Sequence, residues 1–220
     1  MNNIGVIGLS VMGMNLALNM ADKGYKVSIY NRTTSVVDDV MRDHGHKNFT
    51  PTYDLEDFVK SLERPRRIFL MIKSGKPIDM VIDQLMGLLD EGDIIIDGGN
   101  SYFKDTIRRS SYLEDKKINY LGVGISGGEE GARFGPAIMP SGNKEAYGHV
   151  KDIFENISAK AYGEACCKYI STGGSGHYVK MVHNGIEYGD MQLISEAYML
   201  LRDIGGMENS QIQEVFEAWN

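Results

Sequence analysis

Short apolar runs rich in β-branched residues alternate with longer segments of helical period along most of the chain. The runs predict strands at 3–8, 26–30, 67–72, 93–97, 119–123, 136–139 and 166–170, and the segments between them predict helices near 13–23, 34–43, 77–89, 103–116 and 144–158. Strands joined through helices pair in parallel, because each helix carries the chain back across one face of the sheet. The pattern therefore predicts an α/β fold with a doubly wound, mostly parallel sheet.

The pattern changes at a glycine-rich break at 171–176, after which a helical pattern without strand signals runs to about Asp203. Gly205 and Gly206 are expected to end this helix, and Ser210 with Gln213 is expected to form a capping box that opens another. We therefore predict a sheet domain at 1–173, followed at 174–220 by the start of an all-helical domain.

The last predicted helix carries an apolar stripe at helical spacing, formed by Ile212, Val215, Phe216 and Trp219. A helix of about ten residues with an unmatched apolar face is only marginally stable alone. The sequence thus predicts that a segment covering this stripe is missing and that the chain is a fragment of a longer protein.

The turn after the first predicted strand has the glycine spacing G-x-G-x-x-G, with a serine in the second glycine position: Gly8, Leu9, Ser10, Val11, Met12 and Gly13. Gly8 would allow the tight turn and Gly13 the close approach of helix to strand, while the helix N-terminus presents free N–H groups to a pyrophosphate. This pattern indicates a Rossmann-like dinucleotide site. The alternative is a glycine turn that only packs the helix on the strand.

The residues after the second predicted strand indicate which dinucleotide binds. At the place where an Asp or Glu would accept hydrogen bonds from the ribose of NAD, the chain has Asn31, Arg32 and Thr33. A carboxylate would repel a 2′-phosphate, whereas Arg32 can pair with it and stack on adenine. The sequence therefore favours NADP, the alternative being that Arg32 is a solvated loop residue.

One predicted helix carries a polar stripe within about 100° of arc, formed by Lys180, His183, Asn184 and Glu187. The opposite face is apolar and includes two glycines that would allow close packing: Val179, Val182, Gly185, Ile186 and Gly189. The stripe offers bases, acids and hydrogen-bonding groups on one wall of a site. The alternative is an amphipathic helix with its polar face in water.

Two loops follow predicted strands at the sheet edge where ligands bind in such folds, one at 97–101 and one at 125–128. The first reads Asp-Gly-Gly-Asn-Ser, and the second contains two adjacent glycines that can expose backbone N–H groups to an anionic substrate. The alternative is that both are ordinary strand-ending turns.

Composition excludes several other classes of protein. The chain has 23 basic and 30 acidic residues, and this net charge of −7 argues against a nucleic-acid binder. The apolar runs are far shorter than the roughly 20 residues that span a bilayer, and the N-terminus lacks a secretory signal. We expect a cytoplasmic protein without membrane or nucleic-acid partners. The only cysteines, Cys166 and Cys167, suit neither a disulfide framework nor a metal site and are expected to be reduced, in a buried strand.

Six segments together resemble the NADP-dependent, decarboxylating 6-phosphogluconate dehydrogenase family of the β-hydroxyacid dehydrogenase superfamily. They are GLSVMG at 8–13, NRT at 31–33, MIKSG at 71–75, IDGGNS at 96–101, GISGGEEGAR at 124–133 and GSGHYVKMVHNGIEY at 174–188. The resemblance spans essentially the whole chain. It implies oxidation of 6-phosphogluconate at C3 and loss of C1 as carbon dioxide, giving ribulose 5-phosphate and NADPH without a metal, as in the pentose phosphate pathway.

The resemblance also implies roles for individual residues. Lys180 would be the general base that takes the C3 hydroxyl proton, and Glu187 the acid that protonates the enediol carbon after decarboxylation. The implied substrate-binding residues are Asn100, Ser126, Gly127, Gly128, His183, Asn184 and Tyr188. The implied cofactor-binding residues are Gly8, Leu9, Ser10, Val11, Met12, Gly13, Asn31, Arg32, Thr33, Ile72, Lys73 and Asn100.

The chain departs from this family in length, since family members are about twice as long. The resemblance implies a homodimer in which a helical C-terminal domain clamps the substrate phosphate and a tail completes the partner subunit's site. A fragment without these parts is expected to be inactive alone. The alternatives are an NADP-binding module without turnover and a different β-hydroxyacid dehydrogenase.

Overall fold

The computed structural model describes residues 1–220, which form two compact units, Met1–Lys180 and Met181–Asn220. The first unit is an α/β structure, and the second is helical. Helix α9 (Ser175–Met199) begins in the first unit and continues into the second. The chain thus divides by compactness within α9, and the domain boundary expected at 173/174 stays a prediction.

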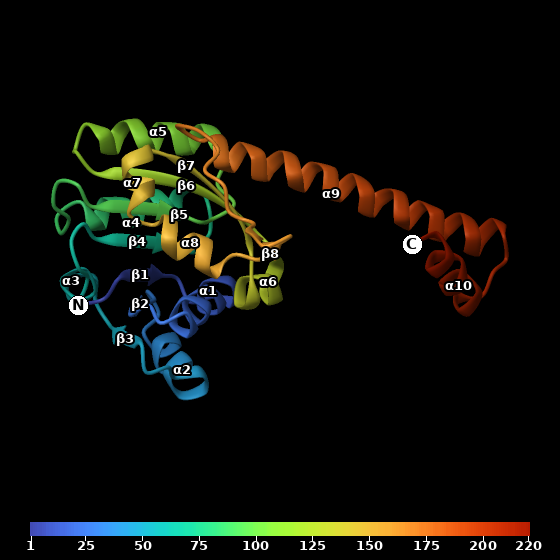
Figure 1. Cartoon of the computed structure of the whole chain (residues 1–220), viewed down its shortest axis with the longest axis horizontal. Coiled ribbons are helices and arrows are strands. Elements are labelled where there is room, and N and C mark those ends of the chain that lie inside the picture. The colour runs from blue at the N-terminus through green and yellow to red at the C-terminus, as the bar shows by residue number, and fades with distance from the viewer. The chain divides into compact units, whose positions relative to one another are not determined.

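A seven-stranded sheet forms the centre of the first unit, with the strand order β3-β2-β1-β4-β5-β6-β7 (Figure 1). The strands are β1 (Ile4–Ile7), β2 (Val27–Tyr30), β3 (Phe49–Thr52), β4 (Arg67–Leu70), β5 (Ile94–Asp97), β6 (Asn119–Ser126) and β7 (Ala137–Gly142). All neighbours pair in parallel except β6 and β7, which are antiparallel. The predicted doubly wound, mostly parallel sheet is confirmed, and its strand order reverses between β1 and β4.

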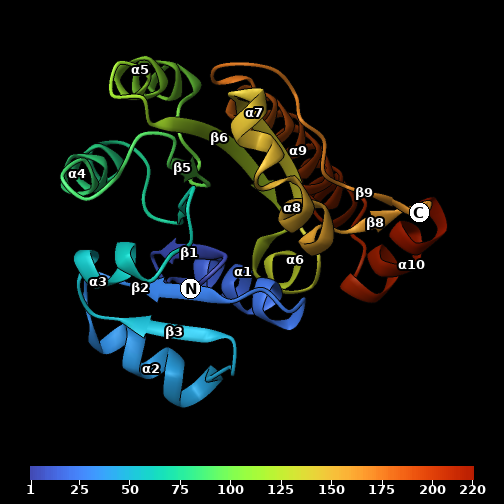
Figure 2. The same ribbon diagram turned by 60° about the vertical axis from the view of Figure 1, so that its left-hand side comes forward.

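Helices cover both faces of this sheet. They are α1 (Val11–Asp22), α2 (Ser35–His44), α3 (Leu55–Lys60), α4 (Lys76–Leu85), α5 (Phe103–Glu114), α6 (Gly128–Phe134), α7 (Lys144–Gly148) and α8 (Lys151–Ile157). Helices α4 and α5 lie on one side of β5 and β6, and α7 and α8 lie on the other (Figure 2). A small antiparallel hairpin follows α8 and consists of two strands of two residues each, β8 (Lys160–Ala161) and β9 (Glu164–Ala165).

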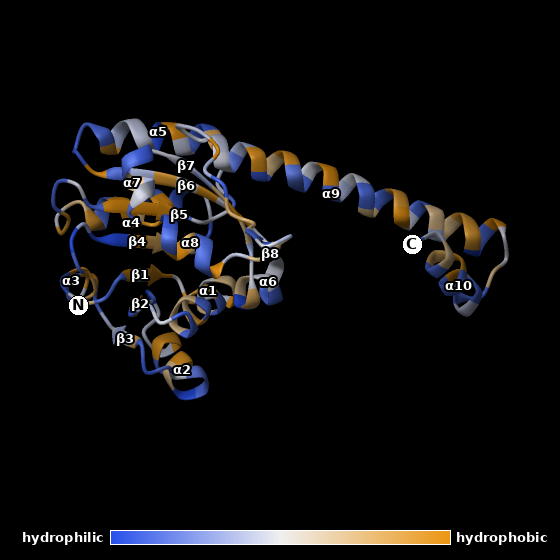
Figure 3. Ribbon diagram, in the orientation of Figure 1, coloured by the Kyte–Doolittle hydropathy of each residue, from blue (hydrophilic) through white to orange (hydrophobic).

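The core consists of two apolar layers, one on each face of the sheet. Successive strand side chains point to opposite faces, so Ile94 and Ile96 pack with the side chains of α1 and α8, whereas Ile95 packs with those of α3, α4 and α5. All three isoleucines are fully buried, and each contributes about 1.5–3 kcal/mol through burial. Figure 3 shows hydrophobic strands between helices that carry hydrophilic outer surfaces.

Strand β3 was not predicted. Its sequence, Phe-Thr-Pro-Thr, has no apolar run and contains Pro51, which lacks a backbone N–H. The strand lies at the edge of the sheet, beside β2 only, where a proline is tolerated. Helix α3 follows directly and is capped by Asp54, whose carboxylate accepts a 2.7 Å hydrogen bond from the Asp57 N–H.

The strand predicted at 166–170 is not formed. The segment lies beside β7, where the Ile138 N–H donates to the Cys166 carbonyl over 2.8 Å and the Lys168 N–H donates to the Ile138 carbonyl over 3.2 Å. Pro140 has no N–H to donate to this segment, although its carbonyl accepts a 2.8 Å hydrogen bond from the Ile170 N–H. Only an isolated bridge therefore results. Both cysteines are free thiols.

Two helix predictions were also wrong, and two helices, α3 and α6, were not predicted. The segment 144–158 forms two helices, α7 and α8, and the loop after β6 opens the unpredicted helix α6. The expected capping box of Ser210 and Gln213 is formed instead by Glu208 and Gln211, at the start of α10 (Asn209–Trp219). The backbone leaves a left-handed turn at Gly206 and is already extended at Glu208, so the helix begins earlier than expected.

The second unit consists of the later turns of α9, a π-helical turn η1 (Leu200–Ile204) and α10. In the apolar stripe of α10, Ile212 is buried and Trp219 is 67% exposed. The expectation that Gly185 and Gly189 serve close packing was wrong for this chain, because a Cβ at either would meet no atom within 4 Å. No helix is long and apolar enough to cross a membrane.

Candidate functional site

The turn between β1 and α1 needs both of its glycines. Gly8 has φ +98°, and a Cβ there would lie 2.5 Å from the Met71 carbonyl oxygen. A Cβ at Gly13 would lie 1.9 Å from the Gly8 carbonyl oxygen. Ser10 is the N-cap residue of α1, and its side chain makes no capping hydrogen bond. The Ser10 side chain therefore leaves the first N–H groups of α1 available to bind an anion.

Asn31 connects this turn to the loop after β2. Its side-chain oxygen accepts a 3.1 Å hydrogen bond from the Leu9 N–H, and its side-chain nitrogen donates a 3.0 Å hydrogen bond to the Thr33 carbonyl. The amide thus fixes the glycine turn and the 31–33 loop relative to each other. These two hydrogen bonds therefore stabilise the two loops that border the predicted dinucleotide site.

A pocket of about 340 Å³ opens at the point where the strand order reverses between β1 and β4. Six predicted cofactor residues line it: Gly8, Asn31, Arg32, Thr33, Ile72 and Lys73. Leu9, Ser10, Val11, Met12, Gly13 and Asn100 do not. The exposed cations Arg32 and Lys73 give the pocket a positive wall, so its chemistry suits phosphate groups.

Sequence reasoning missed Tyr30, Leu55 and Met80 in the lining of this pocket. Partial burial raises the pKa of Tyr30, Asp54 adds to this rise, and Arg32 opposes it. Tyr30 is the last residue of β2, so its place at the carboxyl end of a predicted strand was the available signal.

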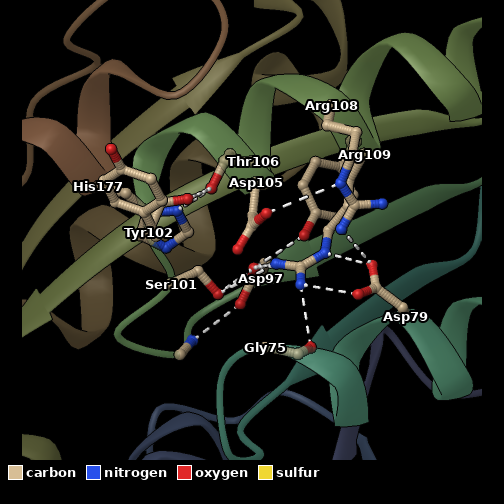
Figure 4. Close-up of polar contacts among 12 residues, drawn as sticks. Gly75, Asp79, Asp97, Ser101, Tyr102, Asp105, Thr106, Arg108, Arg109 and His177 are labelled. Carbon is tan, nitrogen blue, oxygen red and sulfur yellow. Dashed lines mark hydrogen bonds and ion pairs between the residues drawn. The ribbon is translucent and has the colours of Figure 1, made fainter.

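A buried carboxylate organises the loop at 97–101. Asp97 ends β5 and accepts hydrogen bonds from the Ser101 hydroxyl at 2.7 Å, the Gly99 N–H at 3.1 Å and the Tyr120 hydroxyl at 2.8 Å (Figure 4). Asn100 lies exposed between these anchored residues. The loop therefore presents the predicted ligand residue Asn100 from a fixed backbone. Tyr120, on β6, was not predicted.

The glycine loop after β6 has an unusual backbone. Gly127 has φ +140° and Gly128 has φ +60°, both in the region that favours glycine, and both residues are exposed. Ser126 precedes them and is half-buried. Gly127 is the N-cap residue of α6 and Gly128 is its first residue, so the exposed backbone at 127–128 is also the start of a helix.

The first turns of α9 lie on β6. A Cβ at Gly124 would come 2.6 Å from the Lys180 Cβ, and one at Gly122 would come 3.1 Å from Nδ1 of His177. Nδ1 of His177 also lies 2.7 Å from the Thr106 hydroxyl oxygen on α5. Lys180 therefore packs beside Gly124, which precedes Ser126 of the glycine loop by two residues, and it is only 8% exposed.

His177 and Thr106 were not predicted as part of the site. His177 is 2% exposed, and burial lowers its pKa below the ordinary value. Its Nε2 is buried without a hydrogen-bond partner. The signal available in the sequence was helical spacing, because His177 precedes Lys180 by one turn of α9.

The second unit presents the rest of the predicted polar stripe along the continuous helix α9. Nδ1 of His183 lies 3.2 Å from the Asn184 side-chain oxygen and 3.7 Å from a Glu187 carboxylate oxygen. Tyr188 is 69% exposed. These side chains thus offer adjacent acidic, basic and amide groups. No group of three His, Cys, Asp or Glu side chains is arranged to hold a metal ion.

Comparison of the sequence with protein-family models identifies the family of the chain. Residues 3–171 match the family model for the NAD binding domain of 6-phosphogluconate dehydrogenase, and residues 176–220 match that for the C-terminal domain of 6-phosphogluconate dehydrogenase. The chain belongs to the 6-phosphogluconate dehydrogenase family. The family expected from the sequence is thereby confirmed.

Curated members of the 6-phosphogluconate dehydrogenase family match along the whole chain. The decarboxylating enzyme of Lactococcus lactis subsp. lactis (strain IL1403) is 56% identical over 220 residues, which cover 99% of this chain and 47% of the relative. Decarboxylating 6-phosphogluconate dehydrogenase 1 of Saccharomyces cerevisiae is 52% identical, with 99% and 45% covered. The chain spans about half the length of the curated relatives it matches.

Two solved structures also match the fold of the chain. 6-phosphogluconate dehydrogenase of Plasmodium falciparum, described in its apo form and in complexes with NADP+ and with 6-phosphogluconate, has a TM-score of 0.93 and 44% identity, covering 99% of this chain and 47% of that one. 3-hydroxyisobutyrate dehydrogenase of Salmonella typhimurium has a TM-score of 0.77 at 18% identity, covering 96% and 71%. The second likeness shows the shared fold alone.

Proposed function

We propose that the native gene product is an NADP-dependent, decarboxylating 6-phosphogluconate dehydrogenase. The observation that carries this proposal is the position of Lys180, a buried residue of α9 that packs on Gly124 of β6, two residues before the 126–128 loop, in a chain whose own length matches decarboxylating relatives. A buried lysine close to exposed backbone that can bind an anion suits removal of a proton from a sugar acid.

The residues of the pocket between β1 and β4 fit NADP better than NAD. Arg32 and Lys73 supply two cations, and no carboxylate stands at 31–33 to bind a ribose 2′-hydroxyl or repel a 2′-phosphate. Gly8 and Gly13 leave room for a pyrophosphate beside the first turn of α1. When bound, NADP accepts a hydride from the substrate.

The chain's own residues then handle protons. Lys180 takes the proton of the C3 hydroxyl as C3 becomes a ketone. The electrons of the bond between C1 and C2 then move toward this ketone as C1 leaves as carbon dioxide, and Lys180 returns its proton to the C3 oxygen, so an enediol remains. Glu187, two turns further along α9, gives a proton to C2, the carbon that carried C1, while Lys180 again takes the proton of the C3 hydroxyl. The product is ribulose 5-phosphate.

The remaining predicted residues hold the sugar acid. Backbone N–H groups at Gly127 and Gly128, with the Ser126 hydroxyl, suit the carboxylate because they place donors beside a negative charge. The Asn100 amide suits sugar hydroxyls, as do the side chains of His183, Asn184 and Tyr188. We propose that the whole protein is a cytoplasmic homodimer and that residues 1–220 alone do not turn over.

Turnover by the native gene product tests the proposal. We expect NADPH formation together with carbon dioxide released from 6-phosphogluconate isotopically labelled at C1. Gluconate without the phosphate is the matched control and should react far more slowly. NADPH without labelled carbon dioxide would indicate a simple β-hydroxyacid dehydrogenase instead, and NADP binding without either product would indicate a binding module.

A further inference from the structure

A buried arginine lies beneath the two loops that follow β4 and β5. Arg109 is on α5, and its side chain is only 2% exposed. Taking a guanidinium out of water is costly unless its N–H groups are paired. The partners of Arg109 therefore show what this position requires.

On one side, Arg109 holds the loop at 71–75, which carries the pocket residues Ile72 and Lys73. Its Nε donates to one oxygen of Asp79 over 2.8 Å, and its Nη2 to the other oxygen over 3.3 Å. Nη2 also donates to the Gly75 carbonyl over 3.0 Å. Gly75 is the N-cap residue of α4, so Arg109 fixes the end of this loop and the start of its helix together.

On the other side, the same guanidinium reaches the loop at 97–101. Nη1 lies 3.4 Å from the Ser101 hydroxyl oxygen and 3.5 Å from a carboxylate oxygen of Asp97. Asp97 is fully buried and anchors the backbone around Asn100. Arg109 is thus the positive charge beside the carboxylate on which the loop depends.

Figure 4 shows Arg109 between the two loops, with Gly75 and Asp79 on one side and Asp97 and Ser101 on the other. Hydrogen bonding to Arg109 lowers the pKa of Asp79, so this partner is ionised and the pair is charge-assisted. A planar fork with five N–H donors can hold both loops at once, which the single point charge of a lysine cannot do.

We propose that Arg109 is a positioning residue that holds the cofactor loop at 71–75 and the substrate loop at 97–101 in one arrangement. It contacts neither ligand in this scheme and acts through Gly75, Ser101 and Asp97. The inference rests on the proposed function, because it assumes that NADP and 6-phosphogluconate bind at these loops. Both ligands then depend on a residue outside both sites.

The test compares Arg109→Lys with Arg108→Lys in the native gene product. Arg108 is the matched control, since it also pairs with Asp79, at 2.9 Å, but is 57% exposed and bonds neither loop. The dissociation constant for NADP is measured by fluorescence without substrate, the KM for 6-phosphogluconate by turnover, and the melting temperature separately. Arg109→Lys should raise both the dissociation constant and the KM on the order of tenfold. Arg108→Lys should change either by less than about twofold.

If Arg109→Lys lowers only the melting temperature while the folded protein keeps its NADP affinity and KM, the residue is structural and the proposal is overturned. If Arg109→Lys fails to fold, Asp79→Asn takes its place, because Asp79 is one-third exposed and grips the guanidinium on the Gly75 side. This variant should weaken NADP more than 6-phosphogluconate, and an unchanged NADP affinity would overturn the proposal. A wild-type protein that neither binds NADP nor turns over would instead refute the proposed function.

Discussion

Lys180 lies directly on the backbone of Gly124, where an added Cβ would come within 2.6 Å of the lysine's own Cβ. Gly122 leaves room for two side chains, since a Cβ there would lie 2.5 Å from Cγ2 of Thr106 and 3.1 Å from Nδ1 of His177. The two glycines share one face of β6 because strand side chains alternate, and the histidine and lysine side chains they accommodate are one turn apart on α9. Because β6 has glycines at these two positions, α9 packs closely on the strand, and this close packing keeps Lys180 buried.

Gly124→Ala tests this relationship. The new methyl group has no space beside Lys180, so α9 must shift away from β6. We expect a loss of about 1–3 kcal/mol in the free energy of unfolding and a larger fractional loss of turnover, measured by urea unfolding and by NADPH formation. Gly148→Ala is the control, because a Cβ there meets nothing within 4 Å. Equal effects of the two substitutions would contradict the packing argument.

The sequence predicted most of the sheet because strands buried on both faces read as continuous apolar runs, such as Ile94–Asp97 in β5. It failed at the edges, where that signal weakens. Pro51 concealed β3, and Pro140 prevented the segment at 166–170 from forming the ladder that its composition favoured. A proline thus contributed to both errors, and at β3 the lack of an apolar run added to it.

The site shows a similar division. Loops with motif residues were predictable, but the buried groups that hold them were not. Arg108 and Arg109 are adjacent and chemically identical, yet their side chains are 57% and 2% exposed. Only helix phase separates them, since Arg109 shares the buried face of α5 with Thr106 and Leu113. Partners such as Asp79, distant in sequence, come together only through the fold.

Lys180→Met tests the proposed base. Methionine keeps most of the lysine stem, so it suits a side chain that is 8% exposed, and the fold should be retained. Without an amine to take the C3 hydroxyl proton, turnover should fall by at least about a hundredfold. NADP affinity, measured by fluorescence titration, should stay nearly unchanged. A variant that keeps the wild-type rate would exclude Lys180 as the base.

Arg32→Glu tests the choice of dinucleotide. Arg32 is exposed at the mouth of the pocket, so its replacement should not unfold the protein. A carboxylate there repels a 2′-phosphate, and we expect NADP affinity to fall at least about tenfold more than NAD affinity, a difference of about 1.4 kcal/mol. Lys23→Glu makes the same charge change at the exposed C-cap of α1 and should spare both. Equal weakening of NADP and NAD would show that Arg32 does not meet the 2′-phosphate.

His177 should make stability depend on pH. Burial is the main cause of its lowered pKa, while Asp97 raises it and Arg109 lowers it further. The unfolded chain therefore binds a proton near the ordinary pKa of 6.5, and the folded protein binds it only at lower pH. Stability from the neutral ring is complete above that value and is lost as pH falls below it toward the lowered folded pKa, by up to about 1.4 kcal/mol per pH unit.

His177→Asn removes this titration and keeps a polar atom facing Thr106. Its free energy of unfolding, measured with urea between about pH 5 and 8, should be lower than that of the wild type at neutral pH but should fall less steeply in acid. The control His149→Asn removes an exposed histidine and should keep the wild-type slope. If His177→Asn and the wild type lose stability in parallel as pH falls, the buried ring is not the group that senses the proton, because a residue that cannot titrate would then show the same acid dependence.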